Sequence, residues 1–193
     1  RPPGGSTTPI RWPQPQSKAP AMAIAEDLYP SRVASRPSTA ARRDPVVYGE
    51  WTQDAPLTRA QTDSYECNGY LVLEKLFDDR EVALLQREAA RLGFGAPEPE
   101  TAITEPGSGE IRSIFRIHRQ NAAFARLASD ARLVSVARFL LGDEVYIHQS
   151  RLNYKPGFTG KEFYWHSDFE TWHVEDGMPR MRAISMSVLL NDN

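Results

Sequence analysis

The 193-residue sequence contains a single cysteine, Cys67. One cysteine excludes an internal disulfide bond and any zinc or iron–sulfur site that is built from several cysteines. Because thiols stay reduced in the cytoplasm, this low cysteine content fits a cytoplasmic protein, and we expect that location. We expect Cys67 itself to be a small buried or half-buried thiol.

A long apolar run is also absent. No stretch of about 18 apolar residues occurs, so we expect no transmembrane helix. The residues that follow Arg1 lack the apolar segment of a secretory signal. The 23 basic and 25 acidic side chains leave a net charge of −2. This balance favours neither a nucleic acid nor a membrane surface as partner, and it leaves a small neutral or zwitterionic substrate open.

Several common catalytic motifs are missing. The sequence has no Gly-x-Ser-x-Gly elbow, no Walker-type glycine loop and no dinucleotide-binding fingerprint. Ser167 stands between His166 and Asp168, but on a strand its side chain would point away from both. A local serine triad is therefore geometrically poor.

Proline content divides the chain. Residues 1–21 are rich in proline and poor in apolar clusters, so we expect a disordered arm or a non-native extension there. Residues 22–62 keep an irregular pattern and are predicted to wrap over a core as extended segments. Residues 63–193 carry the regular patterns of one domain.

Helical patterns fill the first part of that domain. A short helix is possible over residues 57–65. Asp78, with Glu81 three residues on, predicts the start of a second helix that Gly93 ends, and its apolar stripe should pack on the core. Two more helices are predicted over residues 122–128 and 131–141, the latter between the cap residues Asp130 and Gly142.

Strand patterns are shorter and lie on both sides of these helices. Residues 69–73, 111–117, 145–155 and 182–190 are predicted as strands from β-branched, aromatic and alternating residues. The loop over residues 95–110 is either a lid or a disordered crossing. We therefore expect an α+β fold with its helices on the N-terminal side.

The predicted strand 145–155 places a polar ladder on one face, consisting of Gln149, Arg151, Asn153 and Lys155. On an average antiparallel strand this ladder is simply the solvated side. In a barrel whose interior holds a ligand, the same side chains would donate hydrogen bonds to carboxylates and amides. The residues alone leave both interpretations open.

A histidine and an aspartate, His166 and Asp168, stand two residues apart among aromatic residues. On an extended backbone both side chains would point to the same face and could share one metal ion. An imidazole and a carboxylate are two of the three ligands of a non-haem Fe(II) site. Ionisable groups among aromatic rings are costly to bury unless they are paired or bind a metal.

Three nearby residues have other expected roles. His173 would lie on the opposite face of a continuous strand from His166. His148 is expected to be a packed, hydrogen-bonded core histidine. Glu170 could accept a hydrogen bond that orients a metal ligand.

The run from Phe163 to Ser185, which contains Trp165-His166-Ser167-Asp168-Phe169-Glu170-Thr171-Trp172-His173, resembles the signature of the ectoine hydroxylases. These are non-haem Fe(II), 2-oxoglutarate-dependent dioxygenases related to the phytanoyl-CoA dioxygenases. The resemblance extends from about Asp27 to Asp192 and includes Tyr29-Pro30-Ser31-Arg32, Asp44-Pro45-Val46-Val47-Tyr48 and His148-Gln149-Ser150-Arg151.

The resemblance implies a double-stranded β-helix, a cupin-like jelly roll, with flanking N-terminal helices and with residues 63–193 as its N-terminal portion. It implies hydroxylation of ectoine to 5-hydroxyectoine with Fe(II), 2-oxoglutarate and O₂. No catalytic residue is implied besides the metal ligands, and a homodimer is left open. The implied iron ligands are His166 and Asp168. The implied ectoine-binding residues are Gln149, Thr171 and Trp172, and those for 2-oxoglutarate are Lys155, Asn153, Phe163 and Ser187.

The sequence departs from the family pattern at its end. The family's third iron ligand, a histidine, and the arginine that pairs with 2-oxoglutarate lie beyond Asn193. We therefore expect an N-terminal fragment of a dioxygenase, inactive by itself. A sister dioxygenase that acts on another small molecule and a non-enzymatic cupin-like binding protein remain as alternatives.

Overall fold

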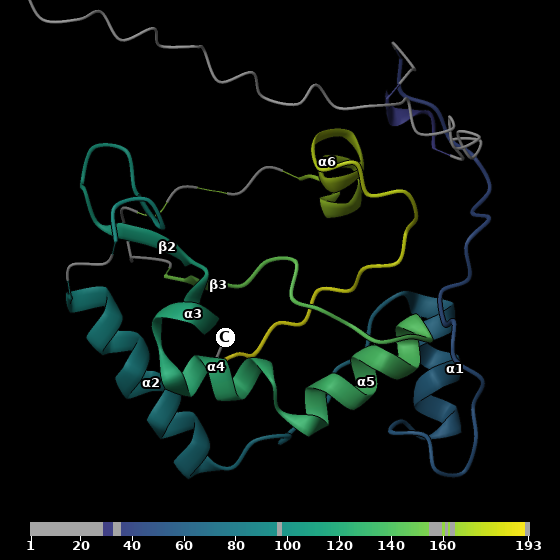
Figure 1. The fold of residues 1–193 in the computed structure, drawn as a ribbon, viewed down its shortest axis with the longest axis horizontal. Helices are drawn as coiled ribbons and strands as arrows, with labels where there is room; N and C mark the ends of the chain where they lie inside the picture. The colour runs from purple at the N-terminus through teal and green to yellow at the C-terminus, as the bar shows by residue number, and fades with distance from the viewer. Residues whose placement is uncertain are drawn as a thin grey trace, which may run out of the picture.

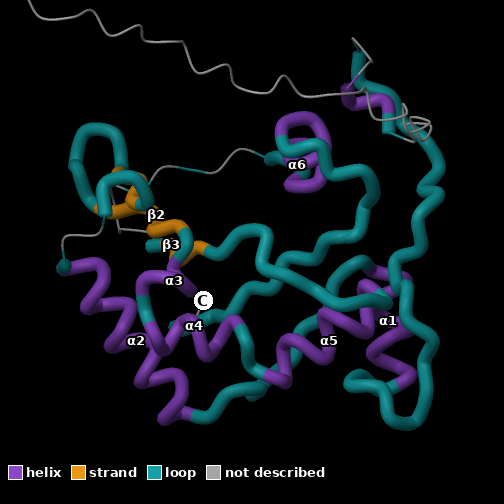
Figure 2. The backbone as a smooth tube through the Cα atoms, viewed as in Figure 1, coloured by secondary structure: helices purple, strands orange, loops and turns teal. Residues whose placement is uncertain are grey.

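Helices dominate the computed structural model, which describes residues 29–32, 36–95, 98–154, 160, 162 and 165–191. Figure 1 shows α2, α4 and α5 along one side, the sheet above them, and α6 on the far side. Long irregular segments join these elements, as Figure 2 shows. In chain order the elements are η1 (Pro30–Arg32), α1 (Arg59–Asn68), α2 (Asp79–Phe94), β1 (Ala102–Thr104), β2 (Ile111–Phe115), α3 (Ile117–Gln120), α4 (Ala122–Ala128), α5 (Ala131–Leu141), β3 (Arg151–Asn153) and α6 (Asp168–Glu175).

The helices start where their capping residues predict. Thr58 and Asp78 each form a capping box, with Gln61 and Glu81 three residues later. The predictions for α4 and α5 are confirmed at both ends, and Asp130 caps α5 through the N–H of Arg132. Capping side chains satisfy N–H groups that have no partner inside the helix, so the signal is local and readable from sequence.

The end of α2 was predicted at Gly93, but the helix continues to Phe94. Gly93 has another role, because the ring of Tyr154 lies so close that a Cβ at this position would be 3.0 Å from it. The Tyr154 hydroxyl donates to the carbonyl of Ala89 at 2.6 Å, and burial raises the pKa of Tyr154 to about 12. This contact joins the end of β3 to α2.

The sheet is antiparallel, in the order β1-β2-β3. Ile114 at its centre pairs with Leu152 and is fully buried. The prediction for residues 111–117 is confirmed as far as Phe115, since Ile117 already begins α3. Within the described part of the predicted strand, residues 145–154, strand pairing is confined to residues 151–153.

Two predicted strands do not form. Residues 69–73 and 182–190 have no strand pairing in the structure. A strand needs a neighbour to satisfy its backbone hydrogen bonds, and apolar alternation alone does not supply one. Within the predicted loop 95–110, residues 102–104 form β1 instead. Helices α1 to α5 precede β3, as expected, and one further helix that was not predicted, α6, follows it.

Two clusters of buried side chains form the core. One is centred on α5 and contains Leu57, Val136 and Leu140. The other joins α2 to α3 and α4, and contains Leu85, Ile117 and Phe124. Leu85 belongs to the predicted apolar stripe of α2, so the stripe does pack on the core.

Cys67 is exposed, contrary to the expectation of a buried or half-buried thiol. It lies in the last turn of α1, away from the side of the helix that carries the buried Thr62. Within the described ranges, no helix is long and apolar enough to cross a membrane.

Arg132 connects the N-terminal ends of α2 and α5. Its Nη2 lies 2.6 Å from Glu81 Oε1 and 2.7 Å from Asp130 Oδ2. Its Nη1 donates to the carbonyl of Leu76 at 2.8 Å, and the guanidinium lies 4.4 Å from the ring centre of Phe77. The side-chain hydrogen bond from Arg132, followed by that from its backbone N–H, lowers the pKa of Asp130 to about 2.

The lowered pKa of Asp130 predicts an acid-dependent loss of stability. The ordinary pKa is 3.8, so this contribution is complete above about pH 4 and is lost as the pH falls toward about 2. Asp130→Asn keeps a capping side chain but removes the charge, and should reduce the free energy of unfolding by about 0.5–1 kcal/mol at pH 7. Urea unfolding should show this difference shrinking between pH 4 and pH 2.

The control is Asp54→Asn, which removes an exposed carboxylate in a turn. A difference between wild type and Asp130→Asn that stays constant from pH 7 to pH 2 would contradict the assignment of the lowered pKa to this contact.

Candidate metal and substrate site

Asp168 is the first residue of helix α6, so the predicted extended geometry of the pair is wrong. Ser167 is the N-cap, and its hydroxyl accepts from the N–H of Glu170 at 3.3 Å. The sequence does contain this signal, because Ser167-x-x-Glu170 has the residue types and spacing of a helix start. Asp168 and Glu170 also place negative charge in the first turn, where the helix dipole favours it.

The helix start nevertheless brings His166 and Asp168 together. His166 Nε2 lies 3.2 Å from Asp168 Oδ1, and both side chains are about half exposed. Ser185 donates its hydroxyl to the other oxygen, Asp168 Oδ2, at 3.3 Å. The Asp168 carboxylate is thus contacted by His166 at one oxygen and by Ser185 at the other.

This donor set fits a metal ion. Two ligands at about 2.1 Å from one ion and at right angles to each other lie roughly 3 Å apart, close to the distance between His166 Nε2 and Asp168 Oδ1. In the described part of the chain, no group of three or more His, Cys, Asp or Glu side chains could hold a metal ion. The pair therefore supplies two ligands of a possible site.

A wide cleft runs from α5 past β3 to α6 and the C-terminal segment. Its volume is about 2210 Å³, well above the roughly 300–1000 Å³ of a small-molecule pocket, so the cleft alone does not define a ligand. Five of the predicted site residues line it, namely Gln149, Asn153, Asp168, Trp172 and Ser187.

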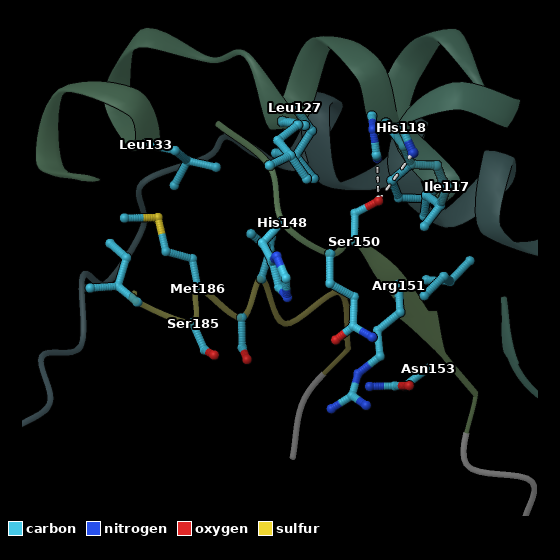
Figure 3. A pocket seen from close by; sticks show the side chains of 18 of the residues that line it. Ile117, His118, Leu127, Leu133, His148, Ser150, Arg151, Asn153, Ser185 and Met186 are labelled. Atoms are coloured by element: carbon cyan, nitrogen blue, oxygen red, sulfur yellow. Dashed lines mark hydrogen bonds between the residues drawn. The ribbon is translucent and has the colours of Figure 1, made fainter. Parts of the chain in front are cut away.

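The ladder residues of β3 face this cleft. Arg151 and Asn153 are exposed, while Leu152 between them packs against the core. Figure 3 shows the Arg151 and Asn153 side chains next to each other on the same side of the strand. Asn153 Oδ1 accepts from the hydroxyl of Ser113 at 2.8 Å, which fixes the amide on the sheet. Gln149 is exposed just before the strand.

The remaining predicted site residues that the structure describes are not among those that line the cleft. Thr171 is exposed, and its hydroxyl donates to the carbonyl of Ser167 at 3.4 Å. Lys155 and Phe163 lie outside the described residues. Glu170 accepts from the hydroxyl of Ser31 at 3.4 Å.

His148 is not a core residue, contrary to expectation. Its side chain is 32% exposed, and its Nε2 lies 3.3 Å from Asp176 Oδ2. Its ring meets that of Trp172 edge-on at 5.1 Å. His148 therefore connects the segment that carries Gln149 to helix α6. The histidine that is buried is His173, which stacks on Phe169 at 5.4 Å.

A contact between a histidine and a serine that both line the cleft could not be predicted from the sequence. His118 Nδ1 is hydrogen-bonded to the hydroxyl of Ser150, as Figure 3 shows. Burial, with a smaller effect of the nearby Arg119 charge, lowers the pKa of His118. Because His118 and Ser150 are far apart in the chain, no local pattern could have linked them.

Ser167→Ala is expected to destabilise α6 without removing a metal ligand. Loss of the cap should lower the free energy of unfolding by about 1 kcal/mol, whereas Ser167→Thr should keep most of it. Urea unfolding followed by circular dichroism measures both variants. The matched control is Ser187→Ala, an exposed serine outside any helix, and an equal loss in this control would contradict the capping role.

Comparison with known proteins shows the family of the chain. Residues 65–193 match the family model described as phytanoyl-CoA dioxygenase. The ectoine dioxygenase of Sphingopyxis alaskensis is 63% identical over 170 residues, which cover 87% of this chain and 56% of that protein. The chain thus spans little more than half the length of this relative.

Two crystal structures of EctD from S. alaskensis are similar to this chain over 81% of its length. The structure with bound Fe has a TM-score of 0.78 and 62% identity, and covers 81% of this chain and 57% of that one. The structure with 2-oxoglutarate and 5-hydroxyectoine has a TM-score of 0.79 and 62% identity, and covers 81% and 56%. The expected α+β class, with a double-stranded β-helix flanked by helices, is confirmed. The chain therefore belongs to the phytanoyl-CoA dioxygenase (PhyH) family.

Proposed function

We propose that the protein that carries this chain hydroxylates ectoine to 5-hydroxyectoine with Fe(II) and 2-oxoglutarate. The observation that carries the proposal is the convergence of His166 Nε2 and Asp168 Oδ1 at 3.2 Å. The high identity with an ectoine dioxygenase supports the choice of substrate. Crystals of the related EctD contain Fe in one case and 2-oxoglutarate with 5-hydroxyectoine in another.

His166 and Asp168 would hold the iron, with a third ligand from outside the described residues. When bound, iron would supply the oxidative chemistry, in which one atom of O₂ would enter ectoine, the other would enter succinate, and 2-oxoglutarate would lose CO₂. The protein's part is to fix the ligand geometry. Ser185 contributes by donating to Asp168 Oδ2, which leaves Oδ1 directed toward His166.

The cleft would bind the two organic substrates. Trp172 offers an apolar wall, and the Gln149 amide can donate to and accept from the polar groups of ectoine. Asn153 and Ser187 offer neutral donors for the carboxylates of 2-oxoglutarate. Lys155 and Phe163 are proposed beside them from the family resemblance, and Thr171 beside Trp172.

A cytoplasmic location is also proposed, on the ground that the sequence contains a single cysteine. A homodimer stays open, as in the sequence analysis.

The test is an assay of the protein that carries this chain. With ectoine, 2-oxoglutarate, Fe(II) and air, mass spectrometry should find 5-hydroxyectoine and succinate in equal amounts. His166→Ala and Asp168→Ala should lower the rate by more than about 100-fold, because even residues that only support metal ligands cost 10–100-fold. Glu175→Gln, an exposed change on the same helix, is the control.

Oxidation of another small molecule, with no turnover of ectoine, would assign the protein to a sister dioxygenase. Ectoine binding without any turnover would instead indicate a non-enzymatic binding protein. Either result would overturn the proposed reaction.

Gln149→Ala should raise the KM for ectoine about tenfold, since a lost hydrogen bond to a polar substrate is worth about 1.4 kcal/mol. The KM for 2-oxoglutarate should stay nearly unchanged. Ser187→Ala should show the reverse pattern, and steady-state kinetics with each substrate varied in turn measures both. Equal effects of the two variants on both KM values would contradict the assignment of separate binding regions.

A further inference from the structure

Helix α6 is covered on its buried face by residues from the other end of the described chain. The ring of Tyr29 lies 4.6 Å from that of Phe169 at 62°, and 5.3 Å from that of His173 at 68°. Phe169 and His173 are the buried residues of α6. Figure 1 shows this helix apart from α2, α4 and α5, so these contacts lie outside the two core clusters.

Arg32 binds the last turn of the same helix. Its Nε and Nη2 donate to the carbonyl of His173 at 2.8 and 2.6 Å. The carbonyls of the last turn have no acceptor role inside the helix, and a positive charge there is favoured by the helix dipole. Ser31, between Tyr29 and Arg32, donates to Glu170 in the first half of the helix.

Tyr29 also fixes the loop that follows the helix. Its hydroxyl accepts from the N–H of Met181 at 3.2 Å, and Asp44 Oδ2 accepts from the same N–H at 3.3 Å. This loop folds back on α6, because the N–H of Met178 donates to the carbonyl of Trp172 at 3.1 Å. The helix and its exit are therefore attached to the same N-terminal residues.

An eight-residue helix is marginal on its own and takes its position from tertiary contacts. We propose that Tyr29, Ser31 and Arg32 form a clamp on α6 that positions Asp168 and Trp172, with Arg32 as the principal positioning residue. The clamp acts on the His166–Asp168 pair through the helix that begins at Asp168. Its effect on the metal site rests on the proposed function, whereas its effect on α6 does not.

The first test measures backbone amide hydrogen exchange in the 193-residue chain. Arg32→Ala removes two charge-assisted hydrogen bonds and should speed exchange across Asp168–Glu175 by about tenfold or more. Arg32→Lys keeps the charge but not the two-pronged donor geometry, so its effect should be intermediate. Arg36→Ala removes the same charge from an exposed position nearby and should leave α6 unchanged.

The second test measures Mn(II) binding by electron paramagnetic resonance in the protein that carries this chain. Arg32→Ala should weaken Mn(II) binding about 10–100-fold, the range for residues that orient metal ligands. Excess Fe(II) should restore much of the lost kcat, which a merely unfolded variant would not allow. Arg32→Lys should recover part of the affinity.

Unchanged exchange of α6 in Arg32→Ala would overturn the clamp. Faster exchange with unchanged Mn(II) affinity would overturn its positioning role. If the wild type bound no Mn(II), the proposed function would fail, and the exchange of α6 would still decide whether the clamp exists.

Discussion

The ion cluster around Arg132 is the contact on which the helical layer depends. Two helices begin at this guanidinium, and each carries one of the two core clusters: Leu85 lies on α2, and Val136 and Leu140 lie on α5. Glu81 and Asp130 place carboxylates at the positive ends of both helix dipoles, and Arg132 neutralises them. The layer in turn holds the sheet, since Leu152 of β3 packs on the α2 cluster.

The site is built differently from the layer that supports it. At the site, the first residue of α6 meets side chains from irregular segments, and the contacts between them are made by the side chains of His166, Asp168 and Ser185. His166 and Asp168 converge because the chain turns into α6 between them, with the Ser167 hydroxyl accepting from the N–H of Glu170 in the first turn of the helix. A His-x-Asp pair whose spacing predicts one face of a strand can thus bring its two ligand atoms, His Nε2 and Asp Oδ1, together at the start of a helix.

Helices α1, α2, α4 and α5 were readable from sequence because their signals are local: a cap, an apolar stripe or a terminal glycine lies within the segment itself. The strands were readable only in part: β2 and a piece of β3 fall inside predicted strands, but residues 69–73 and 182–190 show strand composition and have no pairing neighbour. The identities of the site residues came from the family signature, while their geometry did not. Ser167 and Glu170 carried the missing helix signal, but the aromatic residues around them favoured a strand. The contact between Arg32 and His173 joins positions 141 residues apart and leaves no local trace.

That separation also sets an order of events during synthesis. At about 5–20 residues per second, Arg32 leaves the ribosome roughly 7–28 s before the residue whose carbonyl it binds. The α2–α5 layer contains mostly contacts between neighbouring elements and can form in that interval. Closing so long a loop adds little entropy cost beyond that of a shorter one, because the cost grows only with the logarithm of length. Helix α6 is therefore a late-folding part, completed only when residues 29–32 meet a segment that is synthesised long after them.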